Sequence, residues 1–99
     1  MARIVVWSPR AIDDVDAIAS YIAEDSEFYS GSVVRLILEK ARRLSEFPYI
    51  GRIVPEFGDS SIREVFAYSY RIIYCIDAEE ITISAVIHGK RLLDMAIKP

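Results

Sequence analysis

The sequence IREVFAYSYRIIYCIDAEEITISAVIH, residues 62–88, determines the fold class of this chain. It contains three runs of β-branched and aromatic residues, a composition typical of strands, at Ile62 to Ala67, Tyr70 to Ile76 and Ile81 to His88. The segments that join them, 67–69 and 77–80, have the length of hairpin turns. We therefore expect three consecutive antiparallel strands.

Two helices are expected upstream of these strands. A short strand at Arg3 to Trp7 is followed by Ser8-Pro9, a typical helix start with serine as the N-cap. The apolar residues that follow have helical spacing, at Ile12, Val15, Ile18, Ala19 and Ile22. Ser26 is a second N-cap, before a stripe of Val33, Val34, Ile37, Leu38, Ala41 and Leu44. Phe47-Pro48 is expected to end this helix.

These segments predict a single α+β domain over residues 1–99. A loop is expected from Tyr49 to Ser61, and a short C-terminal helical turn at Leu92 to Ile97. A short connection between the two helices favours an antiparallel helical hairpin. The strand-helix-helix-three-strand order predicts that this hairpin packs on one face of a mostly antiparallel sheet.

The composition narrows the classes of function. Twelve Lys and Arg against 15 Asp and Glu give a net charge of −3, which argues against a protein that wraps broadly on nucleic acid. A hydrophobic content of 53% excludes intrinsic disorder and leaves apolar surface for a partner. Residues 1–34 carry −4 and residues 53–99 carry −2, but residues 35–52 carry +3.

The sequence predicts no metal site and no cofactor. Cys75 is the only cysteine, so an intramolecular disulfide is excluded, and no Cys/His cluster has the spacing of zinc ligands. The longest uncharged stretch, 81–89, is too short to span a bilayer, and no signal peptide is recognisable. We therefore expect a cytoplasmic protein with no membrane association.

Strict alternation along the strands predicts a polar face of the sheet that brings together Arg63, Arg71, Ser84 and His88, with Lys90 and Arg91 just beyond. Arginines that hold phosphate beside a histidine that moves protons would suit phosphodiester cleavage. The alternatives are structural. His88 would bond its neighbours at the strand end, and Arg71 would pair with Glu64. Likewise, the tyrosines at 68, 70 and 74 either stack on bases or belong to the core.

Five motifs, in this order along the chain, carry a resemblance to a known family. They are Trp7-Ser8-Pro9 with its helix, Phe47-Pro48-Tyr49-Ile50-Gly51-Arg52, Arg63-Glu64, Tyr70-Arg71-Ile72-Ile73-Tyr74 and Val86-Ile87-His88-Gly89-Lys90-Arg91. From about residue 3 to residue 91, the chain resembles the RelE/ParE toxin superfamily. The resemblance implies the toxin of a type II toxin–antitoxin system, bound and inhibited by a cognate antitoxin in a hetero-oligomer.

The resemblance implies two alternative targets. ParE-like members poison DNA gyrase, whereas RelE-like members cut messenger RNA on the ribosome as metal-independent endoribonucleases. For a ribonuclease, the implied catalytic residues are Arg63, Arg71 and His88. The residues expected to contact the target or a phosphate are Arg52, Lys90 and Arg91. For Arg52 the alternative is that it only closes a turn.

The ParE-like branch is favoured by the His88-Gly89-Lys90-Arg91 ending and by the acidic charge, because ribosome-dependent nucleases are usually basic. The sequence also lacks the tyrosine after His88 and the lysine pair before the sheet that RelE-like members use. A non-toxic interaction or stability module with the same fold is a third alternative, since a fold can persist without its active surface.

Overall fold

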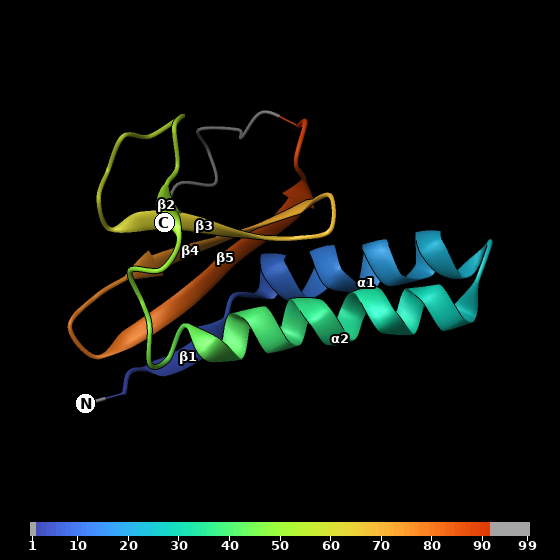
Figure 1. Cartoon of the computed structure of the whole chain (residues 1–99), viewed down its shortest axis with the longest axis horizontal. Coiled ribbons are helices and arrows are strands. Elements are labelled where there is room, and N and C mark those ends of the chain that lie inside the picture. The colour runs from blue at the N-terminus through green and yellow to red at the C-terminus, as the bar shows by residue number, and fades with distance from the viewer. Residues whose placement is uncertain (1, 92–99) are drawn as a thin grey trace.

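The computed structural model describes residues 2–91, in which a helical hairpin packs on one face of a five-stranded sheet (Figure 1). The elements are β1 (Ile4–Trp7), α1 (Pro9–Ala23), α2 (Glu27–Arg43), β2 (Arg52–Ile53), β3 (Ile62–Ala67), β4 (Tyr70–Ile76) and β5 (Glu80–His88). The predicted α+β class, helical hairpin and three-stranded meander are confirmed. The helical turn expected at 92–97 lies outside the described residues.

The strands lie in the order β1-β5-β4-β3-β2. Strands β2 to β5 pair antiparallel with their neighbours, whereas β1 runs parallel to β5, with Ile4 opposite Glu80 and Trp7 opposite Ile83. A tight turn cannot join parallel strands. The chain between β1 and β5 is accordingly long and contains both helices and the other three strands. The sequence predicted the N-terminal strand but not its partner.

Both helices begin where the sequence predicts. The Ser8 hydroxyl accepts a hydrogen bond from the Ala11 N–H at 3.1 Å, and the Ser26 hydroxyl accepts one from the Tyr29 N–H at 3.0 Å. Helix α2 ends at Arg43, earlier than the expected stop at 47–48. The N–H groups of residues 44–46 donate to the carbonyls three residues earlier, so the last turn tightens before the proline is reached.

The main core lies between the hairpin and the sheet. Its buried members come from both layers and are Ala11, Val33, Ile37, Ala41, Leu44, Ala67, Ile72, Tyr74, Ile76, Ile81, Ile83 and Val86. In α1, the buried residue at the start of the stripe is Ala11, whereas Ile12 is exposed. The small side chain of Ala11 suits the close approach of α1 to β5.

The opposite face of the sheet is also covered, so the expectation of a solvated polar face is wrong. Val54, Ile62, Ile73, Ala85 and Ile87 form a second buried cluster there, with Phe57 and Cys75 packed against it. The segment 49–61, expected to be a loop, contains β2, which pairs with β3 and leads the following apolar residues back over the sheet. This segment covers the sheet because its apolar residues, and those of the strands beneath it, are thereby removed from water.

A β-bulge in β5 changes which side chains share a face. Ile73 pairs with Ala85 and Tyr74 pairs with Ile83, so Ser84 is an extra residue. Beyond it the alternation is reversed, and Val86 faces the helices while Ala85 and Ile87 face away. Helix α1 binds β5 at this point, because the Asp14 carboxylate accepts the Val86 N–H at 2.9 Å and the Ser8 hydroxyl donates to the Ser84 carbonyl at 3.1 Å.

Candidate functional site

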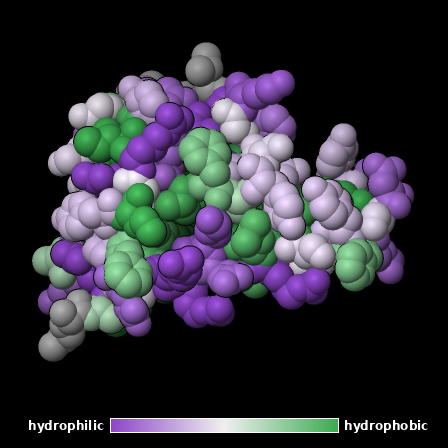
Figure 2. All heavy atoms as spheres, viewed as in Figure 1, coloured by the Kyte–Doolittle hydropathy of each residue, from purple (hydrophilic) through white to green (hydrophobic). Residues whose placement is uncertain are grey.

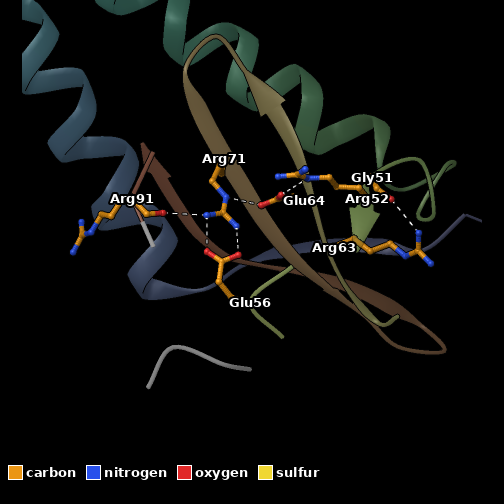
Figure 3. A network of polar contacts seen from close by, with 7 residues as sticks. All are labelled: Gly51, Arg52, Glu56, Arg63, Glu64, Arg71 and Arg91. Carbon is orange, nitrogen blue, oxygen red and sulfur yellow. Dashed lines mark hydrogen bonds and ion pairs between the residues drawn. The ribbon is translucent and has the colours of Figure 1, made fainter. Parts of the chain in front are cut away.

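The site begins with Arg71, which β4 places on the sheet face away from the helices. Its Nε donates to Glu64 Oε1 at 2.6 Å, and its two terminal nitrogens donate to the two Glu56 oxygens at 2.8 Å each (Figure 3). Nη1 also donates to the Arg91 carbonyl at 3.0 Å. The side chain is only 4% exposed. Arg71 therefore joins β3, the loop after β2 and the chain just beyond β5, and the structural alternative, the pair with Glu64, is confirmed.

Glu64 is fully buried between two arginines. Its second oxygen accepts a hydrogen bond from Arg52 Nε, and the Arg52 side chain remains 59% exposed, with its guanidinium 5.3 Å from the centre of the Phe66 ring. Buried carboxylates require paired charges, because desolvation would otherwise favour the neutral acid. The arginines thus hold Glu64 in its place, and Arg52 presents its remaining donors to solvent.

The electrostatics of Arg71 determine what it can do. The hydrogen bonds that Arg71 donates to Glu56 raise the pKa of its guanidinium, burial lowers it, and Glu64 raises it further. The net shift is upward, so Arg71 stays charged and cannot act as a general acid or base. Because two carboxylates and a carbonyl already occupy its donors, it has little capacity left for a phosphate.

Arg63, one residue before Glu64, lies on the other side of the sheet. It pairs across to Tyr74 of the helix-facing core. Its Nε donates to the Ser60 carbonyl at 2.9 Å and its Nη1 to the Gly51 carbonyl at 3.0 Å, while the guanidinium lies over the Tyr49 ring at 5.0 Å. Arg63 therefore links the two sides of the segment that contains β2 through the Gly51 and Ser60 carbonyls.

His88 ends β5 and is exposed. Its Nδ1 accepts the Lys90 N–H at 3.2 Å, and its ring meets Tyr70 edge-on at 5.9 Å between centroids. The expected bonding of His88 to its strand-end neighbours is confirmed. A cleft of ≈ 310 Å³ beside it is also lined by Asp14, Tyr21, Tyr70 and Arg91. Lys90 and Arg91 are themselves exposed.

The expected polar face with Arg63, Arg71, Ser84 and His88 together is not formed. Arg71 lies on the loop-covered face, while His88 and Arg63 lie on the helix side, because the bulge at Ser84 reverses the alternation before His88. The Ser84 hydroxyl is buried with no hydrogen-bond partner in the described part of the chain. Alternation alone could not reveal the bulge, since an extra residue leaves no mark in composition.

Sequence reasoning also missed Glu56 and the role of Tyr74. The buried Tyr74 hydroxyl donates to the Pro48 carbonyl at 2.8 Å and accepts the Gly51 N–H at 3.0 Å. A Cβ at Gly51 would lie 2.5 Å from both the Glu64 carbonyl and the Tyr74 hydroxyl, so only glycine fits. The motif Phe47–Arg52 therefore docks a turn on the sheet and places Arg52 beside Glu64.

The basic middle of the chain lines a cleft of ≈ 390 Å³ next to Glu64. Lys40 and Arg43 of α2 and Arg52 of β2 border it, with Ile50, Val65 and Phe66 among its lining residues. In Figure 2, hydrophobic side chains gather in this region between α2 and the strands, next to hydrophilic side chains along α2. Three of the basic side chains in residues 35–52 therefore lie at one surface.

Among residues 2–91, no three His, Cys, Asp or Glu side chains are grouped as metal ligands would be. Burial raises the pKa of the Cys75 thiol, and the nearby Asp59 and Asp77 charges raise it further. A raised pKa disfavours the reactive thiolate at neutral pH. Neither helix in this part of the chain is long and apolar enough to cross a bilayer.

Comparison with known proteins agrees with this architecture. A solved structure described as "Chromosomal ParDE TA system from P. aeruginosa" has a similar fold, with a TM-score of 0.72 at 19% sequence identity, covering 90% of this chain and 98% of that chain. A search of the curated proteins finds no match. The family model described as "ParE toxin of type II toxin-antitoxin system, parDE" matches residues 5–93. Since that match spans most of the sequence, the chain belongs to the ParE toxin family, the predicted branch of the RelE/ParE superfamily.

Proposed function

We propose that this protein is the toxin of a type II toxin–antitoxin pair, that it poisons DNA gyrase when free, and that a cognate antitoxin inhibits it in a hetero-oligomer. Family membership supports the toxin role. The antitoxin is proposed by analogy with the similar structure, which is described as a ParDE system.

The dispersal of the three candidate catalytic residues is the observation that carries the choice of target. A nuclease needs its phosphate-binding and proton-transferring groups around one reacting phosphate. Here Arg71 is enclosed by Glu56 and Glu64 on one face of the sheet, and His88 lies toward the other. Such an arrangement favours a protein target over cleavage of RNA.

Lys90 and Arg91 are the residues we propose to contact the target. Both are exposed directly after β5, and the Arg91 carbonyl is held by Arg71. Because this bond uses the backbone, replacing the two side chains with alanine leaves it intact. We expect Lys90→Ala/Arg91→Ala to fold normally and to inhibit gyrase at least about tenfold more weakly, as loss of interface hot spots does. A supercoiling assay with purified gyrase measures this.

Arg35→Ala is the matched control, since Arg35 is an exposed arginine on α2 whose terminal nitrogen donates to the nearby Ser32 hydroxyl. It should inhibit like the wild type. Full supercoiling activity at saturating wild-type toxin would contradict the proposal. Cleavage of messenger RNA on translating ribosomes would support the RelE-like alternative instead, and unimpaired growth on expression without antitoxin would support the non-toxic module.

A further inference from the structure

Four exposed aromatic residues lie around the α1–α2 connection and at the β3–β4 turn. We call this group the aromatic cap and define it as Tyr21, Phe28, Tyr29 and Tyr68, whose exposed fractions are 71%, 82%, 48% and 53%. The rings of Tyr29 and Tyr68 meet edge-on at 5.9 Å, so α2 and the β3–β4 turn lie side by side here.

Tyr70 connects the cap to the sheet. Burial raises the pKa of the Tyr70 hydroxyl, and the nearby Tyr21 and Tyr29 hydroxyls raise it further. Tyrosines from α1, α2 and the β3–β4 hairpin therefore lie near one another. Aromatic residues are enriched in protein interfaces and among the residues that dominate binding energy, because they bury a large area with few rotatable bonds.

The backbone at Tyr68 is a second, independent observation. Tyr68 has φ 53°, and within residues 2–91 no other non-glycine residue has a positive φ. The first position of a two-residue hairpin turn favours glycine or asparagine in this region. A bulky aromatic residue here opposes the local preference of the turn and directs its ring onto the cap. Such backbone outliers cluster at functional sites.

The charges beside the cap indicate the chemistry of its partner. Glu24, Asp25 and Glu27 are exposed in the connection between Tyr21 and Phe28, whereas Arg91, an exposed cation, borders the cap on its other side in the cleft shared with Tyr21. The cation–π contacts within the described residues involve Tyr49 and Phe66, so none uses a ring of the cap. Open aromatic faces beside carboxylates suit guanidinium or ammonium groups, whereas the carboxylates repel phosphate.

We propose that the aromatic cap docks on an arginine- or lysine-bearing surface of the toxin's protein target. This inference rests on the proposed function, under which that target is DNA gyrase. The cap and the segment at Lys90 and Arg91 are then two parts of one target-binding end, since Arg91 lines the cleft that also contains Tyr21 and Tyr70.

The test combines a double variant with a matched control. Phe28→Ala/Tyr68→Asn removes two cap rings and places a residue tolerant of positive φ at the strained turn. Ile12→Ala/Leu38→Gln is the control and removes two exposed apolar side chains of the helical hairpin, at the start of α1 and toward the end of α2, away from the cap. The cap variant should keep or raise the unfolding midpoint and bind purified gyrase at least about tenfold more weakly, whereas the control should bind within about twofold of the wild type.

Glu24→Lys tests the charge of the partner. Glu24 is the C-cap of α1, where a cation is favoured by the helix dipole, so the substitution should not destabilise the fold. We expect gyrase binding about threefold or more weaker at low salt, with a smaller loss at high salt. Tighter binding would contradict the proposal that the partner surface carries arginine or lysine. A cap variant that inhibits gyrase like the wild type would overturn the docking surface, as would one that loses only antitoxin binding.

Growth arrest separates this inference from the proposed function. If the wild type arrests growth without acting on gyrase, the gyrase proposal fails. The cap variant is then scored by growth arrest on expression without antitoxin. Loss of arrest would support the cap as the surface that binds the target, and full arrest would overturn it.

Discussion

At the residue scale, two arginines with the same partner differ in what they contribute. Arg71 is buried and bonds two carboxylates, whereas Arg52 binds Glu64 from an exposed position. Breaking a buried ion pair leaves an uncompensated charge, which costs far more than removing an exposed one. This contrast predicts that Arg71 contributes more to the stability of the fold than Arg52 does.

Arg71→Gln should lower the free energy of unfolding by about 3–5 kcal/mol, because Glu64 and Glu56 then lose their main buried cation. Arg52→Gln should cost about 1 kcal/mol, since Glu64 remains paired with Arg71. Urea denaturation of both variants measures the difference. Equal stability of the two variants would show that Arg71 is not the centre of the network.

At the element scale, the position of α1 on the sheet depends on Asp14. Of the acidic residues near the N-terminus of this helix, Asp13 is exposed. Asp14, however, reaches the Val86 N–H of β5 and also pairs with Arg10. The helix is thereby joined to the strand next to the bulge.

Asp14→Ala should destabilise the protein by about 1–3 kcal/mol, because the Val86 N–H then lacks its acceptor. Asp14→Asn keeps an acceptor oxygen and should recover part of that loss. Asp13→Ala, on the same helix, should change the stability by less than about 0.5 kcal/mol. Thermal or urea unfolding compares the three, and a loss in Asp14→Ala no larger than in Asp13→Ala would remove this link from the account.

At the scale of the whole molecule, pH acts on stability through groups at both ends of the pH range. Backbone N–H groups of Glu80 and Glu79 bond the Asp77 carboxylate and lower its pKa. Its contribution is present above the unfolded pKa and is lost as the pH falls through the lower folded value, below about pH 4. Burial raises the pKa of the Tyr74 hydroxyl, with the Gly51 N–H and the Arg63 charge opposing the shift.

For Tyr74 the sign is reversed. The folded state keeps the proton that the unfolded chain loses near pH 10, so stability is complete below that pH and declines as the pH rises above it. We expect unfolding free energies measured from neutral to alkaline pH to fall above about pH 10. Tyr74→Phe should be less stable at neutral pH and decline less steeply. An equally steep decline in Tyr74→Phe would assign it to other groups.

Much of the fold could be read from local signals. Ser8 and Ser26 begin the helices because a hydroxyl at the N-cap satisfies a free N–H, and this chemistry needs no distant residue. The composition of the last three strands predicts them in the same way. The candidate site could be predicted less well from the sequence. Its residues bond partners on other strands, and the strand register decides which residues meet.

The sequence by itself therefore determined the two helices, four of the five strands, their order and the family, and it offered the pair of Arg71 with Glu64 as one of two alternatives. Only the tertiary structure decided which of the candidate site residues lie together. The bulge at Ser84 separates His88 from Arg71, and the segment after β2 covers a face expected to be open and supplies Glu56. The physical reason is that alternation and capping depend on neighbours in the chain, whereas a bulge and a packed loop depend on contacts between distant segments.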